Sequence, residues 1–154
     1  MDFYPTSTFE LEALARQEPT LKPYFGGVLA ADQLPPNPDH FSPRWYIVNT
    51  DPHGRSGQHW IALWTQDDRC EIMDSYGLPL ETYRTGHLKQ WLNTNWSVME
   101  KNNQSLQAVN STTCGQYALR FLVERSQGRY DYVYNDAVIA RWMKSKMVHK
   151  IKTG

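Results

Sequence analysis

The hydrophobic and polar positions of the chain change period several times, from helical to strand-like and back. A capping box at 7–10, followed by apolar residues three and four apart, predicts a short helix over 8–17 that ends before Pro19. Short runs rich in aromatic and β-branched residues, each bounded by polar turns, then predict three strands, at 45–50, 58–65 and 69–74.

The second half of the chain returns to helical periods. It predicts a helix over 87–95, a strand over 105–109, a helix over 115–127 and a final helix that starts at Asn135. The order helix, strands, helix, strand, helix, helix favours an α+β fold over regularly alternating α/β units. We therefore expect a small central mixed sheet flanked by helices, in a single domain over 1–154.

Composition and charge narrow the class of protein. The 154 residues are 40% hydrophobic and 13% aromatic, which is too apolar for a disordered chain. A mean hydropathy of -0.64 argues against an integral membrane protein. The 16 Lys and Arg residues balance the 16 Asp and Glu residues, so no global field attracts nucleic acid or an anionic membrane. A charged partner must therefore bind to a local patch.

The start of the chain and its cysteines indicate a cellular compartment. Residues 1–5 contain neither a basic leader nor an apolar stretch, and no run of apolar residues is long enough to span a bilayer. Only Cys70 and Cys114 are present, too few for a disulfide framework and typical of a reducing compartment. We expect an intracellular protein that is not secreted and has no membrane partner.

His59 and Asp74 are a candidate pair. His59 begins a predicted strand directly after a polar loop, where a side chain can border a cleft. If 58–65 and 69–74 form an antiparallel hairpin, paired residue numbers sum to about 133 to 135. At the lower end of that range His59 lies directly across from Asp74, and at the upper end it lies diagonally across on the same face. The middle value places them on opposite faces, and Asp74 also fits a simple role as a turn residue before Gly77.

Cys114 is a candidate nucleophile. It precedes Gly115 at the point where helical periodicity begins, and Thr112 or Thr113 suits the N-cap. The first turn of a helix favours an anion, so a thiolate would be stabilised there. A nearby imidazolium at such a site can lower a thiol pKa from about 8.5 to roughly 3.5 to 7.5. The alternative is a small buried hydrophobic residue.

Other cofactor chemistry has little support. Cys70 lies within a predicted strand and is interpreted as structural. Two cysteines and scattered histidines lack the paired short spacings of zinc ligands, and no glycine-rich phosphate loop or dinucleotide fingerprint is present. The Gly26-Gly27 pair indicates only a turn. We expect neither a metal nor a small-molecule cofactor.

Several segments resemble, in chain order, the adenovirus endopeptidase (adenain) family of cysteine proteases. The resemblance covers roughly residues 7–125, and the seven-residue step from Gln107 to Cys114 is its most specific element. The matching segments are Pro23-Tyr24-Phe25, Val48-Asn49-Thr50 with Gly57 and His59-Trp60, Met73-Asp74-Ser75-Tyr76-Gly77, Gln104-Ser105-Leu106-Gln107, and Asn110-Ser111 with Cys114-Gly115.

This resemblance implies a role for each site residue. Cys114 would be the nucleophile, His59 the general base and acid, and Asp74 the group that orients the imidazole. The side-chain amide of Gln107 would help to stabilise the oxyanion. The implied protein is a monomeric viral-type cysteine endopeptidase that cleaves precursors, such as virion structural proteins, near small residues such as Gly. It would act in the host nucleus or the virion.

Departures from the adenoviral pattern keep alternatives open. Asp74 stands where those enzymes usually have Glu and resembles the acid of SUMO-specific proteases of the same broad fold, so a protease of ubiquitin-like modifiers is the alternative. Trp96 lies near the place of the cysteine that links their activating peptide, so dependence on a peptide remains open. The chain ends forty residues after Cys114, which suggests a minimal relative from another virus or virus-like element. A non-catalytic DNA-binding or protein-binding module that retains the fold is a third possibility.

DNA is a cofactor in the adenoviral family, and the basic segment 141–154 leads to a testable prediction. It contains no acidic residue, and Lys144, Lys146, Lys150 and Lys152 are its candidate phosphate contacts. Replacing these four lysines with Ala should weaken DNA binding and reduce the salt dependence of the affinity by up to about one unit of slope per lost contact. Fluorescence anisotropy at several salt concentrations measures both. Unchanged affinity would identify the segment as a solvated basic terminus instead.

Overall fold

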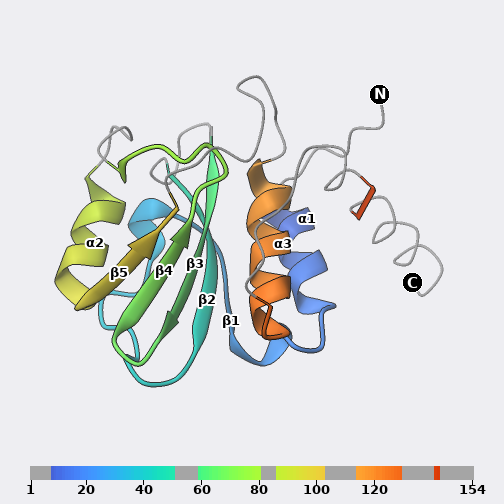
Figure 1. Cartoon of the computed structure of the whole chain (residues 1–154), viewed down its shortest axis with the longest axis horizontal. Helices are drawn as coiled ribbons and strands as arrows, with labels where there is room; N and C mark the ends of the chain where they lie inside the picture. The colour runs from blue at the N-terminus through green and yellow to red at the C-terminus, as the bar shows by residue number, and fades with distance from the viewer. Residues whose placement is uncertain (1–7, 51–58, 81–85, 103–113, 130–140, 143–154) are drawn as a thin grey trace.

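A five-stranded mixed sheet forms the centre of the computed structural model, which describes residues 8–50, 59–80, 86–102, 114–129 and 141–142 (Figure 1). The strands lie in the sheet in chain order: β1 (Phe25–Ala30), β2 (Arg44–Asn49), β3 (Trp60–Gln66), β4 (Arg69–Met73) and β5 (Val98–Lys101). The outer pairs β1–β2 and β4–β5 are parallel, whereas β2–β3 and β3–β4 are antiparallel. The helices are α1 (Thr8–Arg16), α2 (His87–Asn95) and α3 (Cys114–Ser126), with 3-10 turns at Lys22–Tyr24 and Ala31–Gln33.

The predicted α+β class with a mixed sheet flanked by helices is confirmed. The helices α1, α2 and α3 and the strands β2, β3 and β4 each lie within two residues of the ranges that the sequence predicts. The predicted strand at 105–109 lies outside the described residues. Of the predicted final helix, only Arg141 and Trp142 are described, and both are helical.

Two strands were not predicted, and the interpretation of Gly26-Gly27 as only a turn was wrong. Both glycines lie in β1, where the pairing with β2 has an irregularity between Phe25 and Gly27. Glycine weakens a strand signal and often marks a bulge or a close approach. A Cβ atom on Gly26 would lie 2.2 Å from Cε1 of Tyr46, so the absence of a side chain lets the Tyr46 ring pack over β1. The other missed strand, β5, has only four residues.

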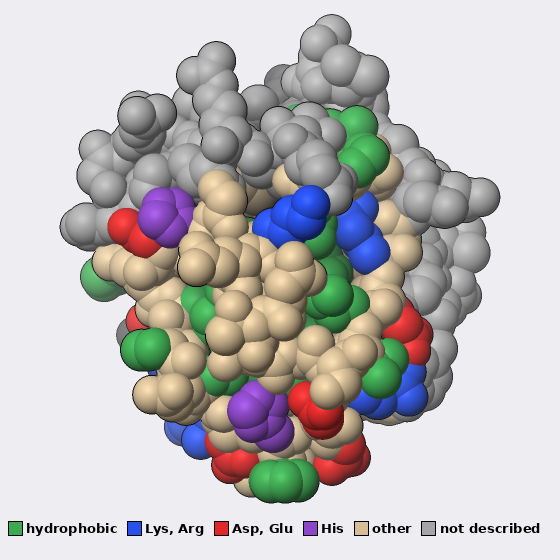
Figure 2. Space-filling model, turned by 90° about the vertical axis from the view of Figure 1, so that its left-hand side faces the viewer, with side chains coloured by type: hydrophobic (Ala, Val, Ile, Leu, Met, Phe, Trp, Pro, Cys, Tyr) green, Lys and Arg blue, Asp and Glu red, His purple; other side chains and the backbone are tan. Residues whose placement is uncertain are grey.

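Helices cover both faces of the sheet, α2 on one side and α1 with α3 on the other (Figure 1). Alternate residues of β2 serve the two layers: Trp45 and Ile47 pack with α1 and α3, whereas Tyr46 and Val48 pack with α2. On the α2 side of the surface, hydrophobic side chains emerge in separate areas between polar atoms (Figure 2). None of the described helices is long and apolar enough to cross a bilayer.

The β3–β4 hairpin has a defined register. Its loop is Asp67-Asp68, and both residues have positive φ, 51° and 59°, as a two-residue type I′ turn requires. The pairing runs from Gln66 opposite Arg69 to Ala62 opposite Met73. This register is the upper end of the predicted range, so His59 and Asp74 are diagonal neighbours on one face.

Helix α3 is anchored along β3 and β4. Tyr117 and Phe121 are buried in the layer between the sheet and α1. Near the other end of the helix, Arg125 forms an ion pair with Glu71 of β4. These contacts fix the direction of α3, so that its first residue, Cys114, lies beside the beginning of β3.

We predict that Gly26→Ala destabilises the protein. The added Cβ would overlap the buried ring of Tyr46, so the free energy of unfolding should fall by about 1–3 kcal/mol. The matched control is Gly86→Ala, because a Cβ there meets no heavy atom within 4 Å and the residue has a φ of -75°. The control should change the free energy by less than about 1 kcal/mol. Urea unfolding measures both, and equal effects would contradict the packing argument.

Candidate active site

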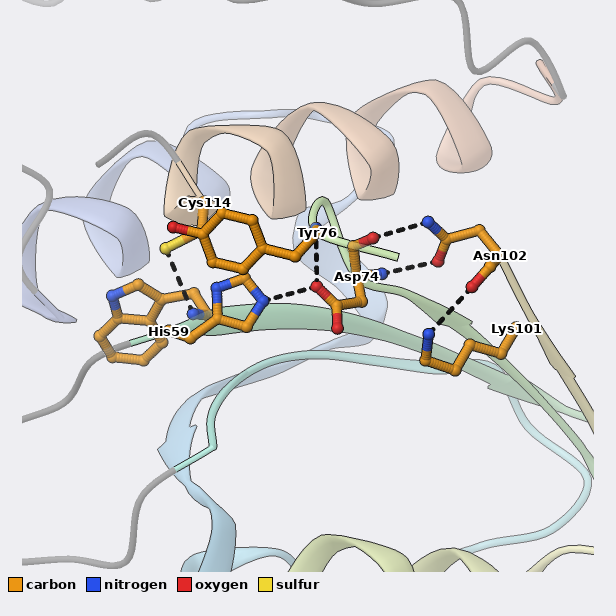
Figure 3. A network of polar contacts seen from close by, with 7 residues as sticks. His59, Asp74, Tyr76, Lys101, Asn102 and Cys114 are labelled. Carbon is orange, nitrogen blue, oxygen red and sulfur yellow. Dashed lines mark hydrogen bonds and ion pairs between the residues drawn. The ribbon is translucent and has the colours of Figure 1, made fainter. Parts of the chain in front are cut away.

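His59 and Asp74 meet at the open end of the β3–β4 hairpin. Nε2 of His59 donates a hydrogen bond to Oδ1 of Asp74 at 2.6 Å (Figure 3). Both residues lie one position beyond the strands that carry them, since β3 begins at Trp60 and β4 ends at Met73. The diagonal register therefore allows the imidazole and the carboxylate to meet at the edge of the sheet.

Cys114 lies on the other side of the imidazole (Figure 3). It is the first residue of α3, and its Sγ accepts a hydrogen bond from the backbone N–H of Trp60 at 3.4 Å. The neighbouring carbonyl of His59 accepts from the N–H of Thr50 at 2.9 Å, so the N–H of Trp60 faces away from β2. Because β4 has already ended, this N–H is available to the sulfur.

The surroundings of His59 favour its charged form. Burial alone would lower the pKa of His59, but the hydrogen-bonded carboxylate of Asp74 and the nearby Cys114 raise the pKa to about 9. Nε2 is engaged by Asp74, which leaves Nδ1 as the ring nitrogen for Cys114. Sγ of Cys114 accepts from the Trp60 N–H and lies at the N-terminal end of α3, two features that favour negative charge near the sulfur.

The three side chains are enclosed to different degrees. Asp74 is 0% exposed, His59 is 4% exposed and Cys114 is 6% exposed. The carboxylate of Asp74 is therefore shielded from water. In this less polar environment its interaction with the imidazole is stronger than it would be in water. His59 and Cys114 each keep a small exposed fraction.

Two residues of this network were not identified as candidates from the sequence. The ring of Tyr76 stacks on His59 with centroids 4.4 Å apart, and its backbone N–H donates to Oδ1 of Asp74 at 2.9 Å. Asn102 follows β5, and its side-chain amide bonds to the backbone of Asp74 (Figure 3). Tyr76 lies within the segment Met73-Asp74-Ser75-Tyr76-Gly77 that resembles the adenain family, whereas no sequence pattern marks Asn102.

Of the remaining candidate residues, the structure describes Cys70 but not those at 107, 112–113 and 144–152. Cys70 is buried in β4, and burial together with the nearby Glu71 carboxylate raises the pKa of its thiol, which agrees with a structural role. Among the described residues no cluster of His, Cys, Asp and Glu could hold a metal ion. Gln107, the candidate caps Thr112 and Thr113, and the basic-segment residues Lys144, Lys146, Lys150 and Lys152 lie outside the described residues.

No family model matches the chain, and no curated protein matches it. Among solved structures, the chain is similar to a crystal structure of the ASFV pS273R protease, with 20% sequence identity and a TM-score of 0.39. The alignment covers 64% of this chain and 42% of that one, so the chain spans less than half the length of the structure it matches.

We predict that one of the five histidines titrates with a midpoint near pH 9. The folded pKa of His59, about 9, lies above its unfolded value. The protonated ring therefore stabilises the fold fully below about pH 6.5, and this stabilisation is lost as the pH rises through the folded pKa. NMR titration of the ring signals measures the midpoint, and His59→Gln assigns the signal. Asp74→Asn should lower the midpoint, and midpoints near 6.5 for all five histidines would contradict the proposed pairing.

Proposed function

We propose that this protein is a cysteine endopeptidase with Cys114 as nucleophile, His59 as general base and acid, and Asp74 as the group that orients the imidazole. The convergence of these three side chains at one end of the sheet is the observation that supports the proposal. The sulfur comes from the start of a helix, the imidazole precedes one strand, and the acid follows the neighbouring strand.

The reaction begins from a thiolate and an imidazolium. The Cys114 thiolate attacks the carbonyl carbon of the scissile peptide bond, and negative charge develops on the carbonyl oxygen. The His59 imidazolium then donates its proton to the amine as the C–N bond breaks, which leaves an acyl group on the sulfur and a neutral imidazole. Next, the imidazole takes a proton from water as the water attacks the thioester, and release of the acid returns the thiolate and the imidazolium.

Asp74 supports the reaction without taking the proton. Its bond to Nε2 fixes the ring so that Nδ1 serves the sulfur, and its charge stabilises the imidazolium. The backbone N–H of Cys114 lies in the first turn of α3, where N–H groups lack intrahelical partners, and it is a natural oxyanion donor. Gln107 is proposed as the second donor from the adenain resemblance.

We propose precursor proteins as substrates, cleaved near small residues such as Gly. Support for this proposal comes from the adenain resemblance of the segments that carry His59, Asp74 and Cys114. A protease of ubiquitin-like modifiers is the second candidate, and the aspartate at position 74 favours it. Both kinds of substrate present a small residue to the sulfur.

A direct test compares the two cysteines. Cys114→Ala should lower the turnover of a Gly-Gly-containing precursor peptide by at least about 1,000-fold, because no other group forms the acyl-enzyme. Cys70→Ala is the matched control and should keep turnover, since Cys70 is buried in the layer under α2. Iodoacetamide followed by peptide mass mapping should label Cys114 and leave the more deeply buried Cys70 unlabelled.

The outcome also separates the candidate functions. Cleavage of the precursor peptide with no action on a panel of tagged ubiquitin-like proteins favours the endopeptidase, and the reverse favours the modifier protease. Turnover that survives Cys114→Ala would exclude Cys114 as the nucleophile. A wild-type protein that neither cleaves any substrate nor labels at Cys114 would be a non-catalytic module.

A further inference from the structure

Asp74 lies one residue beyond β4, where the regular pairing of that strand with both of its neighbours has ended. The ladder between β3 and β4 ends at the pair Ala62 and Met73. On the other side of β4, the parallel pairing with β5 ends at Ile72 and Lys101, after which the N–H of Asn102 donates to the carbonyl of Ile72. Asp74 is nevertheless fully buried, so its N–H and C=O groups both require partners.

The side chain of Asn102 supplies both partners. Its Oδ1 accepts from the N–H of Asp74 at 2.8 Å, and its Nδ2 donates to the carbonyl of Asp74 at 2.6 Å. In a regular parallel ladder, the next bond would run from the N–H of Asp74 to the main-chain carbonyl of Asn102. That carbonyl instead accepts from Nζ of Lys101 at 2.9 Å. The amide of Asn102 therefore acts as a peptide group that extends the sheet by one step.

We propose that Asn102 is a positioning residue, which fixes the carboxylate of Asp74 against His59 by clamping the main chain of Asp74. The proposal rests on the function proposed above, in which the Asp74–His59 bond orients the imidazole. Asn102 contacts neither ring nor sulfur in the described network, so it acts through Asp74 (Figure 3).

The turn after Asp74 holds the carboxylate of this residue in place relative to its main chain. The N–H of Gly77 donates to the carbonyl of Asp74 at 2.9 Å, and the N–H of Tyr76 donates to Oδ1 of Asp74 at 2.9 Å. Gly77 has a φ of 66°, which favours glycine and closes the turn. With its main chain clamped from β5 and its side chain bonded within its own turn, Asp74 presents Oδ1 to His59 in one orientation.

The chemistry of the clamp requires an amide. Asn offers a donor and an acceptor on one short side chain, as a peptide bond does, whereas Ala offers neither and Ser carries a single hydroxyl. The charged and titratable groups of the network come from every adjoining element: His59 precedes β3, Asp74 and Tyr76 follow β4, Lys101 ends β5 and Cys114 begins α3. Neither Asn102→Ala nor Asn102→Ser adds or removes a charge.

The test measures the site rather than the fold. In Asn102→Ala, kcat for the precursor peptide should fall about tenfold with KM unchanged, because a loosened Asp74 no longer holds the imidazole in its reactive orientation in the transition state. The rate at which iodoacetamide labels Cys114 near pH 7 should fall similarly, and the NMR midpoint of His59 should move to lower pH. Asn102→Ser should act in the same direction and provides a second variant if Asn102→Ala does not fold.

Two controls separate positioning from a structural effect. Ile72→Val weakens the packing of β4 but keeps the backbone carbonyl that Asn102 contacts, and Met99→Ala changes an exposed side chain of β5. Both should leave kcat, the labelling profile and the His59 midpoint unchanged. If the Asn102 variants lower thermal stability as Ile72→Val does but keep the wild-type midpoint, the positioning role is refuted. If the wild-type protein has no peptidase activity, the proposed function fails, while the His59 midpoint still decides the role of Asn102.

Discussion

The buried hydrogen bond between His59 and Asp74 is the interaction on which the rest of the site depends. A charged pair removed from water loses solvation, and only good geometry with further hydrogen bonds offsets that loss. Here Oδ1 of Asp74 accepts from both Nε2 of His59 and the N–H of Tyr76, and the Tyr76 ring stacks on the imidazole. These contacts offset the solvation that the carboxylate loses on burial. They also hold the imidazole in one orientation and favour its protonated form.

The fold supplies this geometry by bringing together the ends of its elements. The beginning of β3, the end of β4, the end of β5 and the start of α3 all contribute groups to the network. Backbone groups at such ends are not consumed by regular hydrogen bonding, so the N–H of Trp60 can reach the sulfur and the backbone of Asp74 can be held by a side chain. The paired strands of the sheet lie directly behind these ends and hold the three side chains in place.

The sequence predicted those features that arise from local pattern. The helix at 87–95 and the strands β2 to β4 follow from periodicity, and the candidate His59, Asp74 and Cys114 follow from their places beside strand and helix ends. The hairpin register was limited to three values, and the positive φ of Asp67 and Asp68 selects among them in the structure. Strand β1 was missed because Gly26 gives no strand signal of its own. Its lack of a side chain makes space for the ring of Tyr46 on the neighbouring strand, a contact that local sequence does not show. Asn102 was missed because the bonds of its amide to the backbone of Asp74 form only when β5 pairs with β4 in the folded protein.

The choice of aspartate at position 74 is coupled to the register of the hairpin. In the observed register, the short side chain of Asp74 reaches His59 at 2.6 Å while its own backbone is clamped by Asn102 and its Oδ1 is bonded to Tyr76. Glutamate would extend the carboxylate by one methylene at a position with no exposed surface, so the clamp, the turn or the imidazole would have to move. The acid, the register and the amide of Asn102 therefore form one unit. In this fold, glutamate at position 74 would need a different spacing between the end of β4 and His59.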